Sequence, residues 1–309
     1  MKALFVVEQY PDCNPELAST GISWPVESYV KTWKELSGMD AVVCHYDNRH
    51  IGDTMANIWK VCELFNPAFV LFTEVFGHPS AQLHAMWPML AKAGIPVVVV
   101  WHDSVKGGFR NLPGVALNVL ADTRLPRADI PNSISLWPPH SEELFYRGTK
   151  VRDIDILFCS SRGHKPIAQQ WIADIESRGL KVMWVGGMRE QKLTLNEVAD
   201  LCRRAKIGIN FSQDTANAPH QLKGRVMDIL CTGGMLLEQK NPHTWQMLQD
   251  GKDYVAFDSP FSLWDQAQHH LAHEDIRLAV AESGYNRSRA DYSSKNWWSA
   301  VLSRIGKSL

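Results

Sequence analysis

Two cations and a carboxylate are closely spaced in the stretch from His220 to Asn241. Lys223 and Arg225 come just before Asp228, on an apolar run that ends at Gly233-Gly234. This spacing suits a helix whose N-terminal end faces a phosphate, because unpaired backbone N–H groups and the helix dipole attract anions there. Lysine and arginine add positive charge, so a diphosphate is the expected ligand. A solvent-exposed helix face with ordinary salt bridges is the alternative interpretation.

Further polar residues follow other predicted strands of the same half. In open α/β sheets ligands collect at the carboxyl ends of strands, so these segments are the candidate binding loops. Arg162 and Lys165 lie at the start of a predicted helix, where the helix dipole disfavours cations. Their placement favours an anionic ligand over solvated charge. Asp228 is flanked by apolar residues, and a carboxylate there could accept paired hydrogen bonds from the hydroxyls of a ribose.

The first half of the chain alternates short β-branched runs with segments of helical spacing. This alternation is typical of a parallel sheet covered on both faces. Strands are expected at 3–7, 41–45, 68–72 and 96–101, and helices at 24–36, 53–65 and 79–93. Short extended pieces follow at 115–120 and 133–136, and a domain boundary is expected within 140–150.

The alternation restarts after residue 150, so a second α/β domain is expected. Its strands are predicted at 154–159, 180–185, 207–211 and 235–238, and its helices at 166–178, 195–205, 221–232 and 242–249. Beyond Phe261 the sequence is helical as far as Ile305. Because Trp297 and Trp298 are adjacent and need burial, the last helix is expected to cross back to the first domain.

Length, charge and cysteine content agree with two α/β domains in the cytoplasm. The 309 residues suit two domains of about 150 residues each. The formal charge of -1 gives no global field that would recruit nucleic acid or anionic lipid. The six cysteines form no Cys-x-x-Cys pair, which favours a reduced compartment. The first apolar run ends at Val7, too early for a signal peptide or a membrane span.

The segment from Asp153 to about Asp258 resembles the second domain of the CgeB-like, spore-maturation-type glycosyltransferases. These are relatives of the large GT-B group that includes the group-1 and group-4 enzymes. The likeness covers about a third of the chain well and the N-terminal half in architecture only. Its matching segments are 155–161, 205–211, 222–228, 231–234 and 251–254.

This resemblance implies a GT-B fold, with two Rossmann-like α/β domains facing across a cleft. Residues 1–150 would bind the acceptor and residues 151–309 the nucleotide sugar, for which a UDP-sugar is favoured. Asp228 would hold the ribose, although the family usually has glutamate there, one methylene longer. The residues expected to face the donor, most of them at its diphosphate, are Gly21, Arg162, Lys165, Asn210, His220, Lys223 and Arg225.

Three polar residues after strands of the first domain are candidates for catalysis. Glu74 follows the third strand, and His102 and Asp103 follow the Val-rich fourth strand. If transfer inverts the anomeric centre, Asp103, His102 or Glu74 could act as the general base for an acceptor hydroxyl. If transfer retains the configuration, these side chains would orient the sugar. Capping of the next loop is the alternative role of His102 and Asp103.

No metal and no bound cofactor are expected. Asp153-Ile154-Asp155 mimics the Asp-x-Asp motif of metal-dependent sugar transferases, but the strand follows these residues, so they lie at its amino end. His269, His270 and His273 lack a carboxylate or cysteine at ligand spacing, and an exposed helix face explains them better. In GT-B enzymes fixed cations take the place of a metal at the leaving group.

The sequence therefore predicts a metal-independent hexosyl- or pentosyltransferase that moves a sugar from a nucleotide-diphosphate sugar to an acceptor hydroxyl. Two rivals stay open, namely a GT-B nucleotide-sugar epimerase and a non-catalytic nucleotide-sugar-binding protein. The acceptor is not determined: a cell-surface precursor, a spore component, a protein and a modified base of phage DNA are all compatible. The near-neutral charge does not support nucleic acid.

Overall fold

The computed structural model describes residues 1–10, 23–46, 51–74, 79–102, 112–124, 130–148, 151–160, 165–186 and 193–309. The chain forms two compact units. The first combines residues 1–141 with 294–309, and the second spans residues 142–293. The last helix, which was expected to cross back, therefore belongs to the first unit.

The first unit is built on a six-stranded sheet in which every pairing is parallel. Its strand order is β2-β1-β3-β4-β5-β6. The side chains of β3 and β4 are buried along their whole length, as expected for a sheet covered on both faces. The strands are β1 (Lys2–Val7), β2 (Asp40–His45), β3 (Val70–Glu74), β4 (Val97–Trp101), β5 (Leu117–Leu120) and β6 (Ser133–Ser135).

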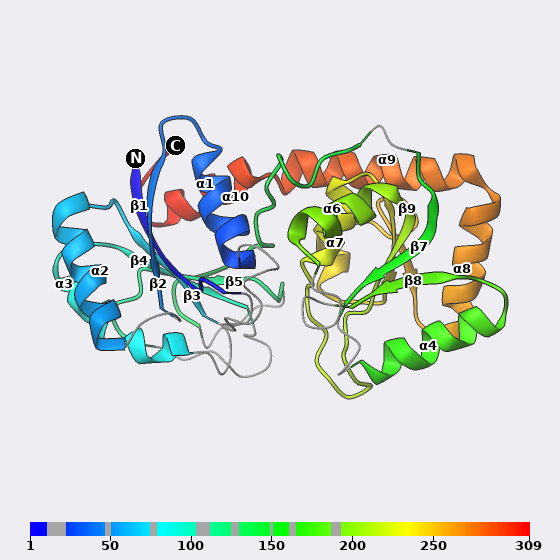
Figure 1. The fold of residues 1–309 in the computed structure, drawn as a ribbon, viewed down its shortest axis with the longest axis horizontal. Helices are drawn as coiled ribbons and strands as arrows, with labels where there is room; N and C mark the ends of the chain where they lie inside the picture. The colour runs from blue at the N-terminus through cyan, green and yellow to red at the C-terminus, as the bar shows by residue number, and fades with distance from the viewer. Residues whose placement is uncertain are drawn as a thin grey trace. The chain divides into compact units, whose positions relative to one another are not determined.

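Helices cover both faces of this sheet (Figure 1). On one face lie α2 (Ile51–Phe65) and α3 (Met86–Lys92), which follows the short 3-10 helix η4 (Pro79–Leu83). The other face packs against the π-helical turn η3 (Val26–Lys31), α1 (Thr32–Lys34) and α10 (Ser294–Arg304).

Trp298 fixes the terminal helix α10 in the core of the first unit. Its indole is fully buried, with its ring centroid 4.8 Å from that of Trp33 and 5.9 Å from that of Phe5. The indole Nε1 donates a hydrogen bond of 3.0 Å to Thr32 Oγ1. The prediction that the last helix returns to the first domain is confirmed.

The second unit repeats this plan with five parallel strands in the order β11-β10-β9-β7-β8. The strands are β7 (Ile154–Cys159), β8 (Val182–Val185), β9 (Ala205–Asn210), β10 (Met235–Gln239) and β11 (Val255–Phe257). Around them lie α4 (Pro166–Ser177), α6 (Leu195–Arg204), α7 (Arg225–Cys231), η6 (Thr244–Gln246), α8 (Pro260–Ala272) and α9 (Glu274–Asp291). The doubly wound α/β architecture predicted from the alternation is confirmed.

Helix α7 is shorter than the sequence pattern predicts. We expected a helix over 221–232, but it begins at Arg225. The preceding residues are held in a loop, since the Gln221 N–H donates to Ser212 O (3.1 Å) and its carbonyl accepts from Asn241 Nδ2 (3.1 Å). Lys223 therefore lies before the helix, and the expected helix over 242–249 is only the short turn η6.

Glycine lets α7 pack closely on the sheet. A Cβ atom at Gly208 of β9 would lie 2.5 Å from Ile229 Cγ1, far inside van der Waals contact. Ile229 and the neighbouring Leu230 are buried. This close packing fixes the position of Arg225, the first residue of the helix.

Candidate functional site

The winding of the second sheet reverses between β7 and β9. Strand β8 lies on one side of β7 and β9 lies on the other, so the carboxyl ends of β7 and β9 flank a switch point. Ligands of open α/β sheets bind at such points. Ser160 directly follows β7 and Asn210 ends β9, which puts both polar side chains at this edge.

Arg225 connects the two strand ends. Its Nη1 donates to Asn210 Oδ1 (3.1 Å), and its Nη2 donates to Ser160 Oγ (3.3 Å). The guanidinium also lies over the ring of Phe158, 5.3 Å from its centroid. Burial lowers the pKa of Arg225, because water is excluded from the charged form. No described carboxylate forms an ion pair with Arg225, and its hydrogen-bond partners Asn210 and Ser160 are neutral, although Asp228, Asp214 and Glu238 act on it from a greater distance.

Two lysines share one carboxylate in the same unit. Lys165, at the N-cap of α4, is buried and pairs with Asp214. Lys223 Nζ lies 3.6 Å from Asp214 Oδ1 and also bonds Gln221. Lys165 and Lys223, which were expected to bind a diphosphate, are thus both close to the carboxylate of Asp214.

His220 and Asp228 have different surroundings. His220 Nδ1 lies 2.7 Å from Ser212 Oγ, and the His220 carbonyl lies 3.1 Å from His243 Nε2. Burial lowers the pKa of both imidazoles. Asp228 is half-buried on α7, one turn after Arg225, and its neighbours on both sides in the sequence are buried apolar residues.

The site also contains a buried carboxyl group that the sequence interpretation did not include. Glu238 lies on β10, and its Oε1 accepts a hydrogen bond of 3.0 Å from Asn210 Nδ2. The available signal was its position at the end of an apolar strand, next to the strand that ends in Asn210. The rule that ligands collect at the carboxyl ends of strands would have selected Glu238 together with Asn210.

In the first unit, Glu74 and His102 lie at the carboxyl ends of neighbouring strands. Glu74 is the last residue of β3, rather than following it, and His102 comes directly after β4. The His102 N–H donates to Glu74 O (3.0 Å). Glu74 Oε1 lies 3.1 Å from His84 Nε2, and His102 Nε2 lies 3.3 Å from Tyr29 Oη. Each candidate therefore has a partner that fixes its orientation.

Three predicted site residues, Gly21, Arg162 and Asp103, lie outside the residues that the structure describes. The aspartates of the Asp-x-Asp look-alike are described and flank the start of β7. Asp153 pairs with Arg204 (2.6 Å) and Asp155 with Lys206 (2.6 Å). Both are thus at the amino end of the strand, opposite the edge at which Arg225 lies.

Within the described ranges of the chain, no group of three or more His, Cys, Asp or Glu side chains is placed to hold a metal ion. His270 is buried rather than exposed as the sequence predicted, and its Nδ1 lies 2.8 Å from Gln266 O in the preceding turn of α8. Over the same ranges, no helix is long and apolar enough to cross a bilayer.

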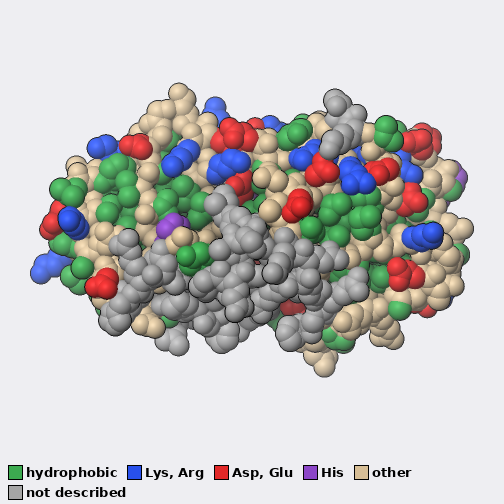
Figure 2. Space-filling view, viewed as in Figure 1, with side chains coloured by type: hydrophobic (Ala, Val, Ile, Leu, Met, Phe, Trp, Pro, Cys, Tyr) green, Lys and Arg blue, Asp and Glu red, His purple; other side chains and the backbone are tan. Residues whose placement is uncertain are grey.

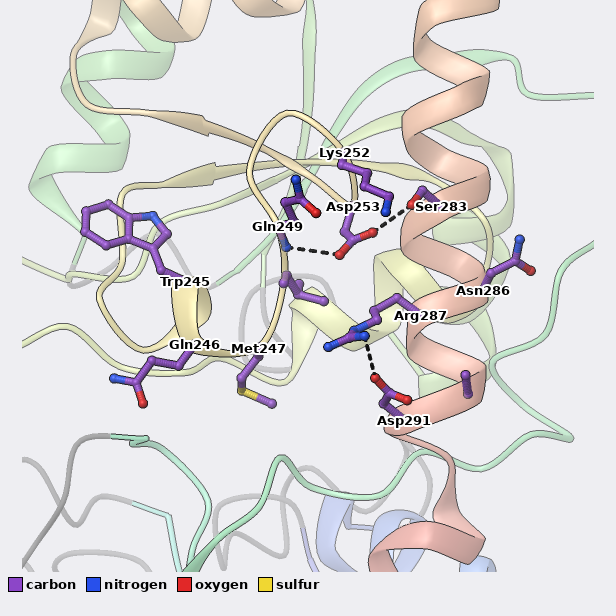
Figure 3. A pocket seen from close by; sticks show the side chains of 12 residues that line it. Trp245, Gln246, Met247, Gln249, Lys252, Asp253, Ser283, Asn286, Arg287 and Asp291 are labelled. Atoms are coloured by element: carbon purple, nitrogen blue, oxygen red, sulfur yellow. Dashed lines mark hydrogen bonds and ion pairs between the residues drawn. The ribbon is translucent and has the colours of Figure 1, made fainter.

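A separate cavity of about 550 Å³ lies between the η6 segment and α9 (Figure 3). Two of its charged groups, Arg287 and Asp253, have partners within the protein, whereas Lys252 is exposed. Arg287 pairs with Asp291 (2.9 Å), while Asp253 accepts from Ser283 Oγ (2.7 Å) and from the Gln249 N–H (3.0 Å). The lining cations of this cavity are therefore a paired arginine and a solvent-exposed lysine, unlike Arg225 at the strand ends.

The comparisons with known proteins agree with this geometry. Residues 164–303 match the family model described as "Glycosyl transferase-like". The structure is similar to that of Anabaena Alr3699/HepE in complex with UDP and glucose, with 11% identity over 97% of this chain and 98% of that chain and a TM-score of 0.63. No curated protein sequence matches the chain significantly.

Two other solved structures give the same result. A glycosyltransferase from Rickettsia africae ESF-5 matches with a TM-score of 0.62 and 9% identity, over 98% of this chain and 97% of that one. A mutant of T4 phage BGT in complex with UDP-glucose matches with a TM-score of 0.59 and 12% identity, over 99% of both chains. The chain therefore has the α/β fold of GT-B glycosyltransferases, as predicted.

Proposed function

We propose that this protein is a glycosyltransferase that moves a sugar from a nucleotide-diphosphate sugar to an acceptor hydroxyl. The observation that carries the proposal is Arg225 at the switch point of the second sheet, bonded to Asn210 and Ser160 and without an ion-pair partner among the described residues. The family-model match and the UDP complexes of HepE and T4 phage BGT support a nucleotide sugar as donor, and UDP as its nucleotide.

The demanding step of such a transfer is departure of the nucleoside diphosphate, on which negative charge develops. Preorganised cations stabilise that charge in proportion to how well water is excluded. Arg225, Lys165 and Lys223 are the described cations that we assign to this role, with Asn210 and His220 completing the donor site. Asp228 is assigned to the ribose, and Gly21 and Arg162 remain assigned to the donor by resemblance.

The first unit is assigned to the acceptor, which we leave unspecified. If the enzyme inverts, His102, Asp103 or Glu74 takes the proton of the attacking hydroxyl; His102 is then oriented by Tyr29 and Glu74 by His84. Figure 2 shows positive and negative side chains intermixed on the face that it displays, which does not favour a nucleic-acid acceptor. The finer assignments to the CgeB-like group, to hexosyl or pentosyl transfer and to the cytoplasm remain predictions.

The test compares the wild-type protein with Arg225→Ala, using UDP-, GDP- and ADP-glucose. Binding is measured by calorimetry, and release of free nucleotide is measured with and without added acceptors. Because hydrogen bonds from a charged donor contribute about 1.5–3 kcal/mol, the variant should bind the donor at least about tenfold more weakly. Arg287→Ala is the matched control, since Arg287 is an exposed arginine of the same unit paired with Asp291.

Four outcomes contradict the proposal or refine it. Wild-type affinity in Arg225→Ala would remove the diphosphate assignment. Binding by the wild-type protein without release of nucleotide in any reaction would indicate the non-catalytic alternative, and a changed sugar on an intact nucleotide would indicate an epimerase. Because three fixed cations supply positive charge, we expect activity to survive chelation; loss that Mg²⁺ restores would refute metal independence.

A further inference from the structure

Glu238 is a buried carboxyl group for which the fold alone gives no reason. It is fully buried on β10, where burial of an unpaired charge is costly. Its Oε1 accepts hydrogen bonds from Asn210 Nδ2 (3.0 Å), Thr244 Oγ1 (3.1 Å) and Asn241 Nδ2 (3.3 Å). Its Oε2 is buried and has no hydrogen-bond partner among the described residues. No described cation forms an ion pair with it.

The hydrogen bond from Asn210 connects Glu238 to the donor site. A side-chain amide has a donor end and an acceptor end. With its Nδ2 held by Glu238, Asn210 must direct its Oδ1 toward Arg225, whose Nη1 lies 3.1 Å away. The reversed amide would direct N–H groups at the guanidinium and lose both bonds. Glu238 therefore determines which way the amide of Asn210 points.

We propose that Glu238 is a positioning residue of the donor site: through the Asn210 amide it holds the guanidinium of Arg225 in the orientation that a nucleoside diphosphate requires. The proposal rests on the proposed function, because it takes Arg225 as the diphosphate-binding cation. Glu238 is completely buried, and Asn210 connects it to Arg225. In this proposal Glu238 therefore acts through Asn210 and does not itself touch the ligand.

The charge of Glu238 gives this role a measurable signature. Burial raises the pKa of Glu238 to about 7, while the bonds from Asn241, Asn210 and Thr244 and the charge of Arg225 act in the opposite direction. Both protonation states retain an acceptor oxygen for Asn210, so the orientation survives ionisation. The ionised form adds a negative charge behind Arg225 and weakens its attraction for an anion. Donor affinity should therefore fall as the pH rises through 7.

Other charged groups act on this pair from the surrounding elements. Burial raises the pKa of Tyr254, which precedes β11, and the charge of Glu238 acts in the same direction. Burial lowers the pKa of Arg225, and Cys159, Asp228 and Asp214 act against that lowering. The helices packed on β10 carry Arg277, which is paired with Glu274, and His270, which is bonded to Gln266 O. All of these groups remain in a variant changed only at Glu238.

The experiment measures affinity for UDP-glucose at pH 6 and pH 8 by calorimetry. This probe is used because its diphosphate is esterified at both ends and keeps its charge over that range. The wild-type protein should bind about tenfold more weakly at pH 8, as the added charge acts on Arg225. Glu238→Gln retains an acceptor but cannot ionise, so it should bind at pH 8 as the wild-type protein does at pH 6.

Two further variants separate positioning from general stability. Asn210→Ala removes the connection and should weaken binding at least about tenfold at both pH values. Asp253→Asn changes another buried carboxylate of the same unit, bonded to Ser283, and should keep the wild-type pH dependence. If Glu238→Gln fails to fold, the wild-type pH profile and Asn210→Ala decide the question.

The outcomes distinguish a failure of the role of Glu238 from a failure of the proposed function. Equal pH dependence in the wild-type protein and Glu238→Gln, or wild-type affinity in Asn210→Ala, overturns the role of Glu238 while leaving the donor site in place. If the affinity of the wild-type protein does not fall between pH 6 and pH 8, the role of Glu238 is likewise overturned and the donor site stays in place. Absence of binding by the wild-type protein to UDP-, GDP- and ADP-glucose overturns the proposed function and this inference with it.

Discussion

Replacing Glu238 by glutamine should change how the stability of the protein depends on pH. Burial raises the pKa of this carboxyl from its ordinary value of 4.5 to about 7, which corresponds to roughly 3 kcal/mol. Because the folded-state pKa lies above the unfolded one, the folded protein loses this stability as the pH rises from 4.5 through 7. Glutamine does not ionise, so Glu238→Gln should gain roughly 3 kcal/mol relative to the wild-type protein over that range.

Urea unfolding followed by circular dichroism at pH 4.5, 5.5, 6.5 and 8 measures this difference. The imidazoles of His220 and His243, whose pKa burial lowers, destabilise the folded protein as the pH falls. They occur in both proteins, so their contribution cancels when the two free energies of unfolding are subtracted. A difference that stays constant within about 0.5 kcal/mol across the series would refute the argument that burial holds this carboxyl partly protonated near pH 7.

Three other variants test the site and the fold. Asp214→Asn frees Lys165 and Lys223 from an internal anion, so calorimetry should show affinity for UDP-glucose rising by up to about fivefold, as a pair of this kind contributes about 0.2–1 kcal/mol; weaker binding would mean that Asp214 positions the lysines instead. His102→Ala should lower the rate of transfer about 100-fold without changing donor affinity, if His102 is the general base, and an unchanged rate in a transfer assay would exclude it. Trp298→Ala should destabilise the first unit by about 3–5 kcal/mol in urea unfolding, whereas a loss below about 1 kcal/mol would contradict its place in the core.

The sheet strands were the most predictable part of the structure. Strand β7 has the bounds expected from its apolar run, Ile154–Cys159, because a strand buried on both faces must be apolar nearly throughout. The start of α7 was wrong by four residues. The segment before Arg225 is held by Ser212 and Asn241, which are distant in sequence, and periodicity does not register such bonds.

The donor site was predictable where a predicted helix start or the resemblance indicated it. Arg225 was selected by its place near the start of a predicted helix and by resemblance, and Asn210 by resemblance; the structure brings them into contact. The pairing of Lys165 with Asp214 depends on a loop 49 residues away, so the sequence offered no signal for it. Glu238 was overlooked because a single carboxylate within an apolar strand resembles an ordinary strand end until its partners are known.

The return of α10 to the first unit has a consequence for biosynthesis. Residues 142–293, which form the second unit, precede Trp297 and Trp298 in the chain. Domains usually fold in order from the N-terminus during translation. Here the first unit lacks part of its core until α10 is present, whereas the second unit contains all of its own elements without α10. A released chain that ends near residue 293 should therefore contain a protease-resistant second unit beside a protease-sensitive first one.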